Sequence, residues 1–348
     1  MDTPDTRGAG AGRGSTVVSD GDSGVGPTVG RRPRPLLSWA SALLLTGTGI
    51  VVGCRALGID AVTPVPQLLA FLPWLLVPTG CALLLALLAG RPVLIGLALL
   101  VAAVNSWFLL PYEPAGAAVD DGPVVARLRV LAANVEFGRA TPGLISAVRS
   151  EKPDLVFVPE CDHGCARSLA TELPAAAYPY RKVVARGGAE GSAILSTYPL
   201  KPAEGIASTL AMPGAVAVVG GQQVRVQLAH PLPPVPRHLG TWRTELEAIR
   251  AYVAGGGGPT LVAGDFNASQ DHAAFRRVLD AGAGLRDSAA AAGAARTPTW
   301  PAKTLPVLGT QIDHVLVSRE FSVRNVRFLD LPQTDHRALL TDLQLHTP

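Results

Sequence analysis

Polar residues of types that could do chemistry close a series of apolar runs in this chain. Taken in order, they are Asn134, Glu160, His230, Asp265, Asn267, Asp313 and His336. Carboxylate and amide oxygens at strand ends can hold a hard divalent ion, and a histidine beside a carboxylate can accept a proton from water. Because α/β folds place their sites just beyond strand ends, we expect these side chains to converge on one site.

Three oxygen-bearing residues are candidate metal ligands. Glu160 follows the apolar run LVFVP, Asn134 follows VLAA, and Asp335 precedes His336. Mg²⁺ usually takes one or two carboxylates together with water and phosphate oxygens. A single carboxylate at a strand end is more often a helix cap or part of a solvated loop, so only the combination is informative.

The segment from Gly264 to Asn267 offers a second kind of chemistry. If it is extended, Asp265 and Asn267 project to the same side. Asp265 would then orient a water molecule or bind metal, and Asn267 would donate to charge that develops on a transferring phosphoryl group. The alternative is a turn in which Asp265 only caps a helix.

Two histidines complete the set. A histidine base needs a carboxylate on its second ring nitrogen to fix its tautomer, and Asp313 is the candidate partner of His336. Asp335 would assist that base or act as a second metal ligand. His230 closes the run VRVQLA and would contact the reacting phosphate or protonate the leaving group, although a lone histidine there is more often structural.

The elements that must position these residues alternate in type. Strands are expected at 128–133, 155–158, 182–185, 192–196, 215–219, 224–229, 260–263, 314–317, 323–329 and 338–345. Helices are expected at 141–150, 164–172, 239–253 and 271–281. The pattern predicts an α/β fold in which two mixed β-sheets pack together with helices outside.

The front of the chain has a different composition. Hydrophobic residues make up 48% of the 348 residues and charged residues 16%, and the mean hydropathy is +0.29. The excess of hydrophobic residues lies in three apolar segments at 36–59, 68–89 and 93–110. Each segment is near the ~20 residues that a membrane-spanning helix needs. We therefore predict a disordered tail at 1–35, a three-helix membrane anchor at 36–111, a linker at 112–126 and a catalytic domain at 127–348. Buried core helices are the alternative for the apolar segments.

Basic residues predict the orientation. Arg31, Arg32 and Arg34 precede the first apolar segment and Arg91 lies between the second and third, whereas 60–67 has no Lys or Arg. The positive-inside rule then places the N-terminus in the cytoplasm and the catalytic domain outside the cell membrane, in a multi-pass topology. Arg55, near the end of the first apolar segment, does not follow this distribution of basic residues, and we expect its side chain to extend outward.

The net charge of +3 does not by itself indicate nucleic-acid binding. Cys161 and Cys165 lie directly after Glu160, in the segment CDHGC. An oxidising compartment favours a disulfide, while free thiols and a metal site with His163 are the alternatives.

Several of these segments resemble the endonuclease/exonuclease/phosphatase superfamily, which includes DNase I-like nucleases, abasic-site endonucleases, neutral sphingomyelinases and inositol polyphosphate 5-phosphatases. The resemblance covers about 127–345, and its pieces are NVEFG at Asn134, PDLVFVPE, GSAILSTYPL, the histidine at 230, GDFN, IDH and TDH. It implies a four-layer α/β sandwich, with Mg²⁺ or Mn²⁺ bound chiefly at Glu160. It also implies that Asp265 and Asn267 act on the nucleophile and transition state, and that Asp313 and His336 form the base.

Three positions depart from the family pattern, since Val158-Pro159 replaces Leu-Gln before Glu160 and Thr334 replaces Ser. The chain also resembles the membrane-tethered bacterial branch, some members of which are linked to polyprenyl-diphosphate dephosphorylation. That branch implies a phosphorylated substrate carried by a membrane lipid. A nuclease acting on DNA or RNA is the second hypothesis and an inactive envelope-binding module the third.

The sequence indicates no oligomeric state, and we expect the loops 231–238 and 290–308 to shape the mouth of the site.

Overall fold

The computed structural model describes residues 34–114 and 122–347. The expected disordered tail therefore lies almost wholly outside the described residues, as do residues 115–121 of the expected linker. Strand β1 begins at Val124, inside the segment expected to be linker.

The described residues form two six-stranded mixed sheets with the strand orders β11-β12-β1-β2-β4-β3 and β5-β6-β7-β8-β10-β9. β1 and β2 are parallel, as are β7 and β8, and the other pairs are antiparallel. The strands are β1 (Val124–Ala132), β2 (Leu155–Pro159), β3 (Tyr180–Val184), β4 (Ser192–Ser196), β5 (Leu200–Pro202), β6 (Gly214–Val219), β7 (Gln222–Ala229), β8 (Thr260–Asp265), β9 (Arg286–Asp287), β10 (Asp313–Val317), β11 (Phe321–Asp330) and β12 (Arg337–His346).

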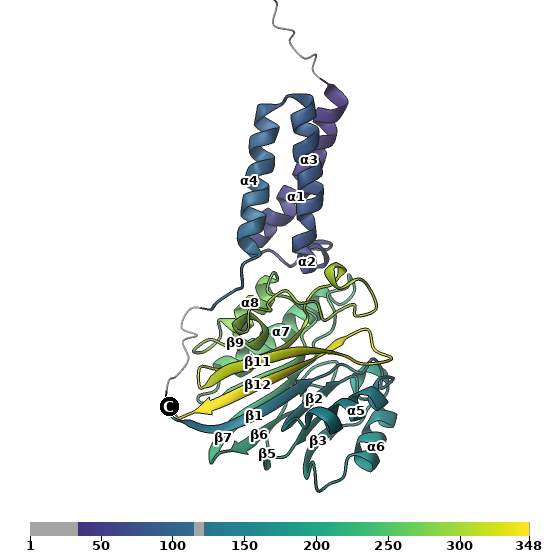
Figure 1. The fold of residues 1–348 in the computed structure, drawn as a ribbon, viewed down its shortest axis with the longest axis vertical. Helices are drawn as coiled ribbons and strands as arrows, with labels where there is room; N and C mark the ends of the chain where they lie inside the picture. Colours follow the sequence, from purple (N-terminus) through teal and green to yellow (C-terminus); the bar gives the residue numbers. More distant parts are fainter. Residues whose placement is uncertain (1–33, 115–121, 348) are drawn as a thin grey trace, which may run out of the picture.

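Helices cover the outer face of each sheet, so the catalytic domain has four layers (Figure 1). The helices and helical turns of this domain are α5 (Thr141–Glu151), α6 (His163–Glu172), η2 (Gly188–Glu190), α7 (Leu239–Ala254), α8 (Ala273–Leu279), α9 (Ser288–Ala291) and η3 (Pro306–Leu308). Aliphatic side chains such as Val130, Val226 and Leu261 fill the space between the sheets. The predicted α/β sandwich is confirmed.

The apolar patterns located most strands, but short elements escaped them. β5, β9 and α9 have too few residues to show a periodicity. The helix expected at 271–281 is shorter, Ala273–Leu279, because residues before it form a turn in which the His272 amide donates to the Ser269 carbonyl at 3.0 Å.

The central strands of both sheets end at the same edge of the sandwich. In the antiparallel register of β8 and β10, Asp265 lies opposite Asp313. Gly264 has φ +143°, and a Cβ there would lie 2.2 Å from the Ala229 carbonyl oxygen. Glycine is therefore required where β7 and β8 approach each other beside the site.

The front of the chain forms a helical bundle whose elements are α1 (Pro35–Leu57), α2 (Val65–Ala70), η1 (Leu72–Leu75), α3 (Leu76–Ala89) and α4 (Pro92–Phe108). Two helices, Pro35–Leu57 and the continuous stretch Leu72–Ala89, are long and apolar enough to cross a membrane. The third apolar helix, Pro92–Phe108, is shorter, at 17 residues. Length and composition alone thus support two of the three expected spans.

The bundle is joined to the catalytic domain by buried polar contacts. Arg55 at the end of α1 lies 3.3 Å from Asp271 Oδ1, and Arg296 donates to Asp271 Oδ2 at 2.7 Å. The guanidinium of Arg55 therefore extends out of the apolar bundle, to a buried carboxylate of the sandwich. Asp60 Oδ2 also accepts a hydrogen bond of 2.6 Å from the amide of Ala274.

Candidate active site

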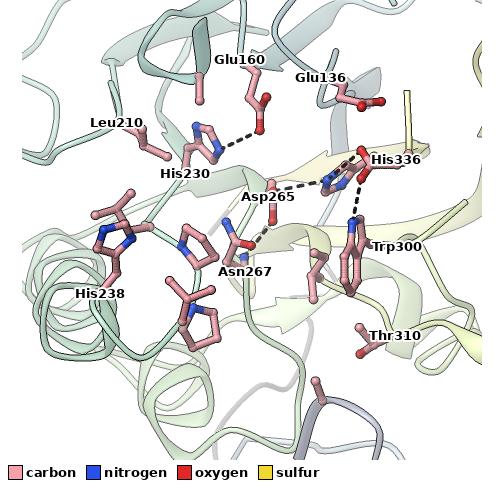
Figure 2. Close-up of a pocket in the computed structure, with 18 of the residues that line it drawn as sticks. Glu136, Glu160, Leu210, His230, His238, Asp265, Asn267, Trp300, Thr310 and His336 are labelled. Carbon is pink, nitrogen blue, oxygen red and sulfur yellow. Dashed lines mark hydrogen bonds and ion pairs between the residues drawn. The ribbon is translucent and has the colours of Figure 1, made fainter. Parts of the chain in front are cut away.

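The residues predicted to do chemistry meet at one edge of the two sheets. Figure 2 shows five of them, Glu160, His230, Asp265, Asn267 and His336, around one cavity. His336 lies just before β12 and Asp313 begins β10. The His336 Nδ1–H group donates to Asp313 Oδ2 at 2.9 Å, so the predicted pairing is present. The second ring nitrogen, Nε2, faces Asp265 Oδ2 and Asp335 Oδ1, each at 3.8 Å.

The loop after β1 joins two of the carboxylates. Asn134 donates from Nδ2 to Glu160 Oε1 and to Asp265 Oδ2, both at 3.1 Å. The other Glu160 oxygen accepts from the amide of Phe137 at 2.9 Å. Glu160 itself has φ +58°, an uncommon conformation that lets its side chain turn back towards this loop. Asn134 therefore orients Glu160 and Asp265 in this structure.

Burial and neighbouring charges shift the proton affinities of the site. Burial raises the pKa of Asp265 to about 7, although attraction to His336 opposes the rise. Burial alone would lower the pKa of His336, but attraction to Asp313 and Asp265 outweighs it and raises the pKa to about 10. Without a bound cation, Asp265 and His336 thus form a buried ion pair, in which the carboxylate of Asp265 faces the imidazolium of His336.

His230 occupies the opposite side of the site. It is buried, and its Nε2 lies 3.7 Å from Glu160 Oε1. Burial, followed by repulsion from His336, lowers the pKa of His230 to about 3, so the ring is neutral near neutral pH. Within the described part of the chain, its Nδ1 is buried without a hydrogen-bond partner. A buried polar atom of this kind is costly unless a ligand or water satisfies it.

The segment around Asn267 is not extended. Asn267 has φ +48°, and its amide donates to Asp265 Oδ1 at 2.8 Å in a tight turn. Its side-chain Nδ2 donates to the Pro231 carbonyl at 3.0 Å. Both Asp265 and Asn267 still line the cavity, because the turn, rather than strand alternation, brings their side chains together.

Two supporting residues were not predicted in these roles. The Trp300 ring Nε1–H group donates to Asp335 Oδ2 at 3.0 Å. The Thr334 hydroxyl donates to the Asn134 carbonyl at 3.0 Å and accepts from the His336 amide at 3.1 Å. The Thr334 position in the TDH motif was noticed only as a departure from the family pattern.

The donor set fits a divalent cation. The nearest ligand atoms of Asp265, Asp313 and His336 all lie within 4.8 Å of one another, and all three residues are buried. Glu160 and Asp335 add two further carboxylates to the same edge. Buried carboxylates without a compensating cation are costly, and hard divalent ions prefer oxygen ligands, so the site suits Mg²⁺ or Mn²⁺. There are two candidate sets of metal ligands. One is the predicted set of Asn134, Glu160 and Asp335, and the other is the cluster of Asp265, Asp313 and His336.

The site opens into a cavity of about 680 Å³. The loop 231–238 contributes Leu232, Pro233, Pro234, Val235 and His238 to its lining. From 290–308 only Trp300 lines it among the described residues, followed by Thr310 just beyond that loop. The cavity also includes Gln67, Ala70 and Phe71 of the helical bundle, a contribution that no motif indicated.

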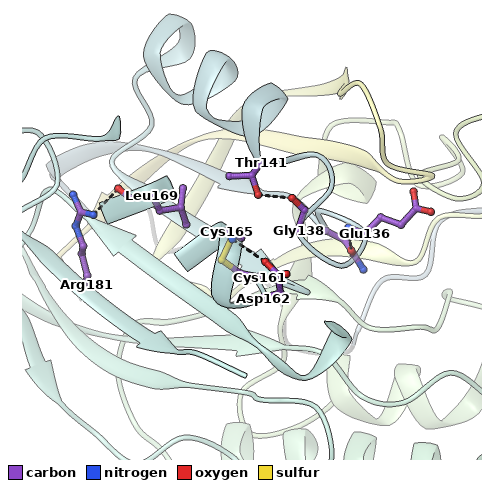
Figure 3. Close-up of a disulfide and its surroundings, with 9 residues drawn as sticks. Glu136, Gly138, Thr141, Cys161, Asp162, Cys165, Leu169 and Arg181 are labelled. Atoms are coloured by element: carbon purple, nitrogen blue, oxygen red, sulfur yellow. Dashed lines mark hydrogen bonds between the residues drawn. A yellow bond between two sulfur atoms is a disulfide. The ribbon is translucent and has the colours of Figure 1, made fainter. Parts of the chain in front are cut away.

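A disulfide holds the chain behind Glu160. Cys161 and Cys165 are bonded to each other, so the disulfide alternative is the one observed (Figure 3). Asp162 between them caps α6 by accepting from the Cys165 amide at 2.8 Å. The bond and the cap together restrain the turn that follows Glu160.

The sequence model of the Endonuclease/Exonuclease/phosphatase family matches residues 131–336. The chain belongs to this family. The matched residues run from the end of β1 to His336 and include every predicted site residue. Members of the family are hydrolases that act on phosphate esters and typically use divalent metals, and this chain is such a hydrolase. No curated protein sequence matches the chain.

Solved structures show the same family fold. TDP2 from D. rerio, complexed with single-strand DNA product, is 16% identical with a TM-score of 0.53, covering 63% of this chain and 99% of that one. An endonuclease/exonuclease/phosphatase from Bacteroides vulgatus is 18% identical with a TM-score of 0.52, covering 63% and 99%. One from Beutenbergia cavernae DSM 12333 is 18% identical with a TM-score of 0.50, covering 63% and 72%. At these identities the likeness concerns the fold.

Proposed function

We propose that this protein is a membrane-anchored, Mg²⁺- or Mn²⁺-dependent hydrolase of a lipid-linked phosphate ester or anhydride, similar to a polyprenyl-diphosphate phosphatase. The observation that carries the proposal is the position of the catalytic charges at one end of a cavity with many apolar lining residues, in a chain that also has long apolar helices. A phosphate group suits the charged end, and a hydrocarbon suits the apolar walls.

In this proposal the cation is held by Glu160 and Asp335, with Asn134 as a third ligand. When bound, it would supply positive charge to the phosphoryl oxygens and favour the neutral form of His336. Asp313 fixes the tautomer of His336, so that Nε2 is the nitrogen free to accept a proton from water.

The remaining residues act on the substrate and the transition state. Asp265, between Asn134 and His336, orients the attacking water for in-line attack on phosphorus. The Asn267 amide has a second N–H bond available for a phosphoryl oxygen. His230, neutral and with an unpartnered Nδ1, contacts the phosphate or the leaving group.

The proposed topology has three membrane crossings, with the N-terminus in the cytoplasm and the catalytic domain outside. The basic residues at 31–34 and Arg91 favour this orientation. A disulfide beside Glu160 is consistent with an extracytoplasmic domain, because such bonds persist in oxidising compartments.

The test is phosphate release by the full-length protein in detergent, from undecaprenyl diphosphate and in parallel from plasmid DNA. We expect Mg²⁺-dependent phosphate from the lipid, intact DNA, and loss of the reaction with EDTA and in the His336→Ala variant. Nicked DNA with untouched lipid would establish the nuclease hypothesis instead. A cellular phenotype that survives both His336→Ala and Asp265→Ala would indicate a binding module.

A further inference from the structure

The substrate cavity has a wall that belongs to the membrane anchor. Gln67 and Ala70 of α2, together with Phe71, line the same cavity as Asp265 and His336. Figure 1 shows α2 at the end of the helical bundle that meets the catalytic domain. The family match begins only at residue 131, so this wall lies outside the part of the chain that the family defines.

Hydrogen bonds hold this wall against the two loops that frame the cavity. Gln67 donates from Nε2 to the carbonyl of Pro234 in the loop 231–238. Trp74 donates from Nε1 to the Val307 carbonyl at 2.9 Å. The Pro66 carbonyl accepts from His272 Nε2 at 2.8 Å, close to the turn that carries Asn267. The anchor is therefore fixed to the active site and is more than a tether.

Two of the three wall residues are apolar. Ala70 and Phe71 line the cavity together with Leu210, Leu232 and Val235 of the catalytic domain. A free phosphate ion gains nothing from such a surface, whereas a hydrocarbon attached to the phosphate is removed from water by it.

The apolar surface continues outside the cavity at the junction of anchor and domain. Leu305 and Val307 are 67% and 69% exposed, and Leu308 and Trp74 beside them are also exposed. Clustered exposed apolar side chains next to membrane-spanning helices suit contact with the lipid boundary. A hydrocarbon could thus run from the bilayer to the charged end of the cavity along apolar side chains.

We infer that the anchor forms the part of the active site that binds the hydrocarbon of a membrane-borne phosphate ester or diphosphate, with Ala70 and Phe71 as specificity-determining residues. This inference rests on the proposed function, because it assigns a place to the apolar part of that substrate. The occupant is the hydrocarbon nearest the phosphate, and the remainder of a long lipid stays in the bilayer.

Chain-length dependence provides the first test. The full-length protein in nanodiscs with Mg²⁺ is given dimethylallyl, geranyl and farnesyl diphosphate, and kcat/KM is expected to rise with length. Phe71→Ala should lower kcat/KM for farnesyl diphosphate roughly tenfold, mainly through KM, and leave the dimethylallyl value within about twofold. Leu68→Ala is the matched control, since Leu68 is an exposed apolar residue of the same helix and does not line the cavity. An equal loss of kcat/KM on all three substrates, or no loss on any of them, would overturn the inference.

Thiol protection tests binding without turnover. Cys54 and Cys81 are replaced by Ser, and Ala70→Cys and Ala61→Cys are compared, Ala61 being an exposed residue of the preceding loop. Dodecyl phosphate should slow maleimide labelling of Ala70→Cys at least about fivefold, inorganic phosphate should not, and Ala61→Cys should be unaffected.

The two tests separate failure of the inference from failure of the proposed function. Protection of Ala70→Cys with no hydrolysis of any isoprenyl diphosphate would overturn the proposed function and leave the anchor wall standing. Hydrolysis that is unaffected by Phe71→Ala, with Ala70→Cys unprotected, would overturn the anchor wall alone.

Discussion

Two buried clusters of charge lie on either side of the turn that follows β8, and they are balanced in different ways. The junction cluster consists of Asp271 with Arg55 and Arg296, and both Asp271 oxygens contact a guanidinium. The site cluster consists of the four carboxylates Glu160, Asp265, Asp313 and Asp335, which lie beside His336 and the neutral ring of His230.

The difference separates a structural from a functional use of buried charge. Arginine is always charged, so the Asp271 carboxylate is compensated within the chain and can hold the helical bundle in place. Histidine carries charge conditionally, and because His230 is neutral near neutral pH, a single histidine, His336, faces three of the four carboxylates. Such a site is completed by a bound cation, whereas the junction is complete without one.

The largest expected effect comes from exchanging an acid for its amide in the site cluster. Asp265→Asn should lower kcat/KM by roughly 10²–10⁴-fold, because the water loses its orienting carboxylate. The unfolding temperature of the metal-free protein should be unchanged or higher, because burial disfavours the ionised carboxylate that the substitution removes. Phosphate release and tryptophan fluorescence on heating measure the two effects, and a large loss of stability would contradict the comparison.

The same exchange in the junction cluster should have the opposite signature. Asp271→Asn leaves the buried Arg55 and the partly buried Arg296 with a neutral partner and should destabilise the protein by about 3–5 kcal/mol. The fraction that remains folded should keep kcat/KM within a few-fold. Urea unfolding in detergent measures the stability change, and a variant as stable as the wild type would show that the junction pairs contribute nothing.

Metal removal should act on the site cluster alone. At a Mg²⁺ concentration of about 100 times Kd, binding should stabilise the wild type by about 2.7 kcal/mol. EDTA should abolish both this gain and the activity. The gain should be smaller in Glu160→Gln, which removes a proposed ligand, and unchanged in a variant of the surface residue Arg250, such as Arg250→Gln. Equal Mg²⁺ stabilisation of Glu160→Gln and wild type would place the ion elsewhere.

The smallest expected effect is a pH dependence near the junction. His272 accepts from the Ser269 amide through Nδ1 at 2.9 Å and donates to the Pro66 carbonyl through Nε2, so only the neutral ring satisfies both partners. Burial lowers the pKa of His272 below its usual value of 6.5. The unfolded chain therefore binds a proton that the folded chain does not, and stability falls as the pH decreases below about 6.5, by at most about 1.4 kcal/mol per pH unit.

The measurement is the difference between wild type and His272→Gln, whose amide can also accept and donate but does not titrate. Urea unfolding between pH 6.5 and 4.5 should show a shallower decrease for the variant. Parallel curves for the two proteins would mean that His272 titrates normally in the folded state.

The two-sheet sandwich and the position of the polar residues at its edge could be predicted from the residue pattern. Apolar runs such as LVFVP and TLVAG are buried strands, and the polar residue after each run had to lie at a strand end. The pairing of Asp313 with His336 was also predictable, because a histidine base needs a carboxylate partner. These inferences depend on local pattern, which the sequence displays directly.

The surroundings of those residues depend on contacts between distant parts of the chain, and the residue pattern does not contain them. Strand alternation could not place Asn267, because its left-handed backbone depends on hydrogen bonds to Asp265 and Pro231. The partners of Arg55 and Trp300 lie far along the chain, and spacing carries no information about them. For Ala70 and Phe71 the sequence predicted only a membrane anchor, and the packing of the helical bundle against the sandwich is what brings them to the cavity.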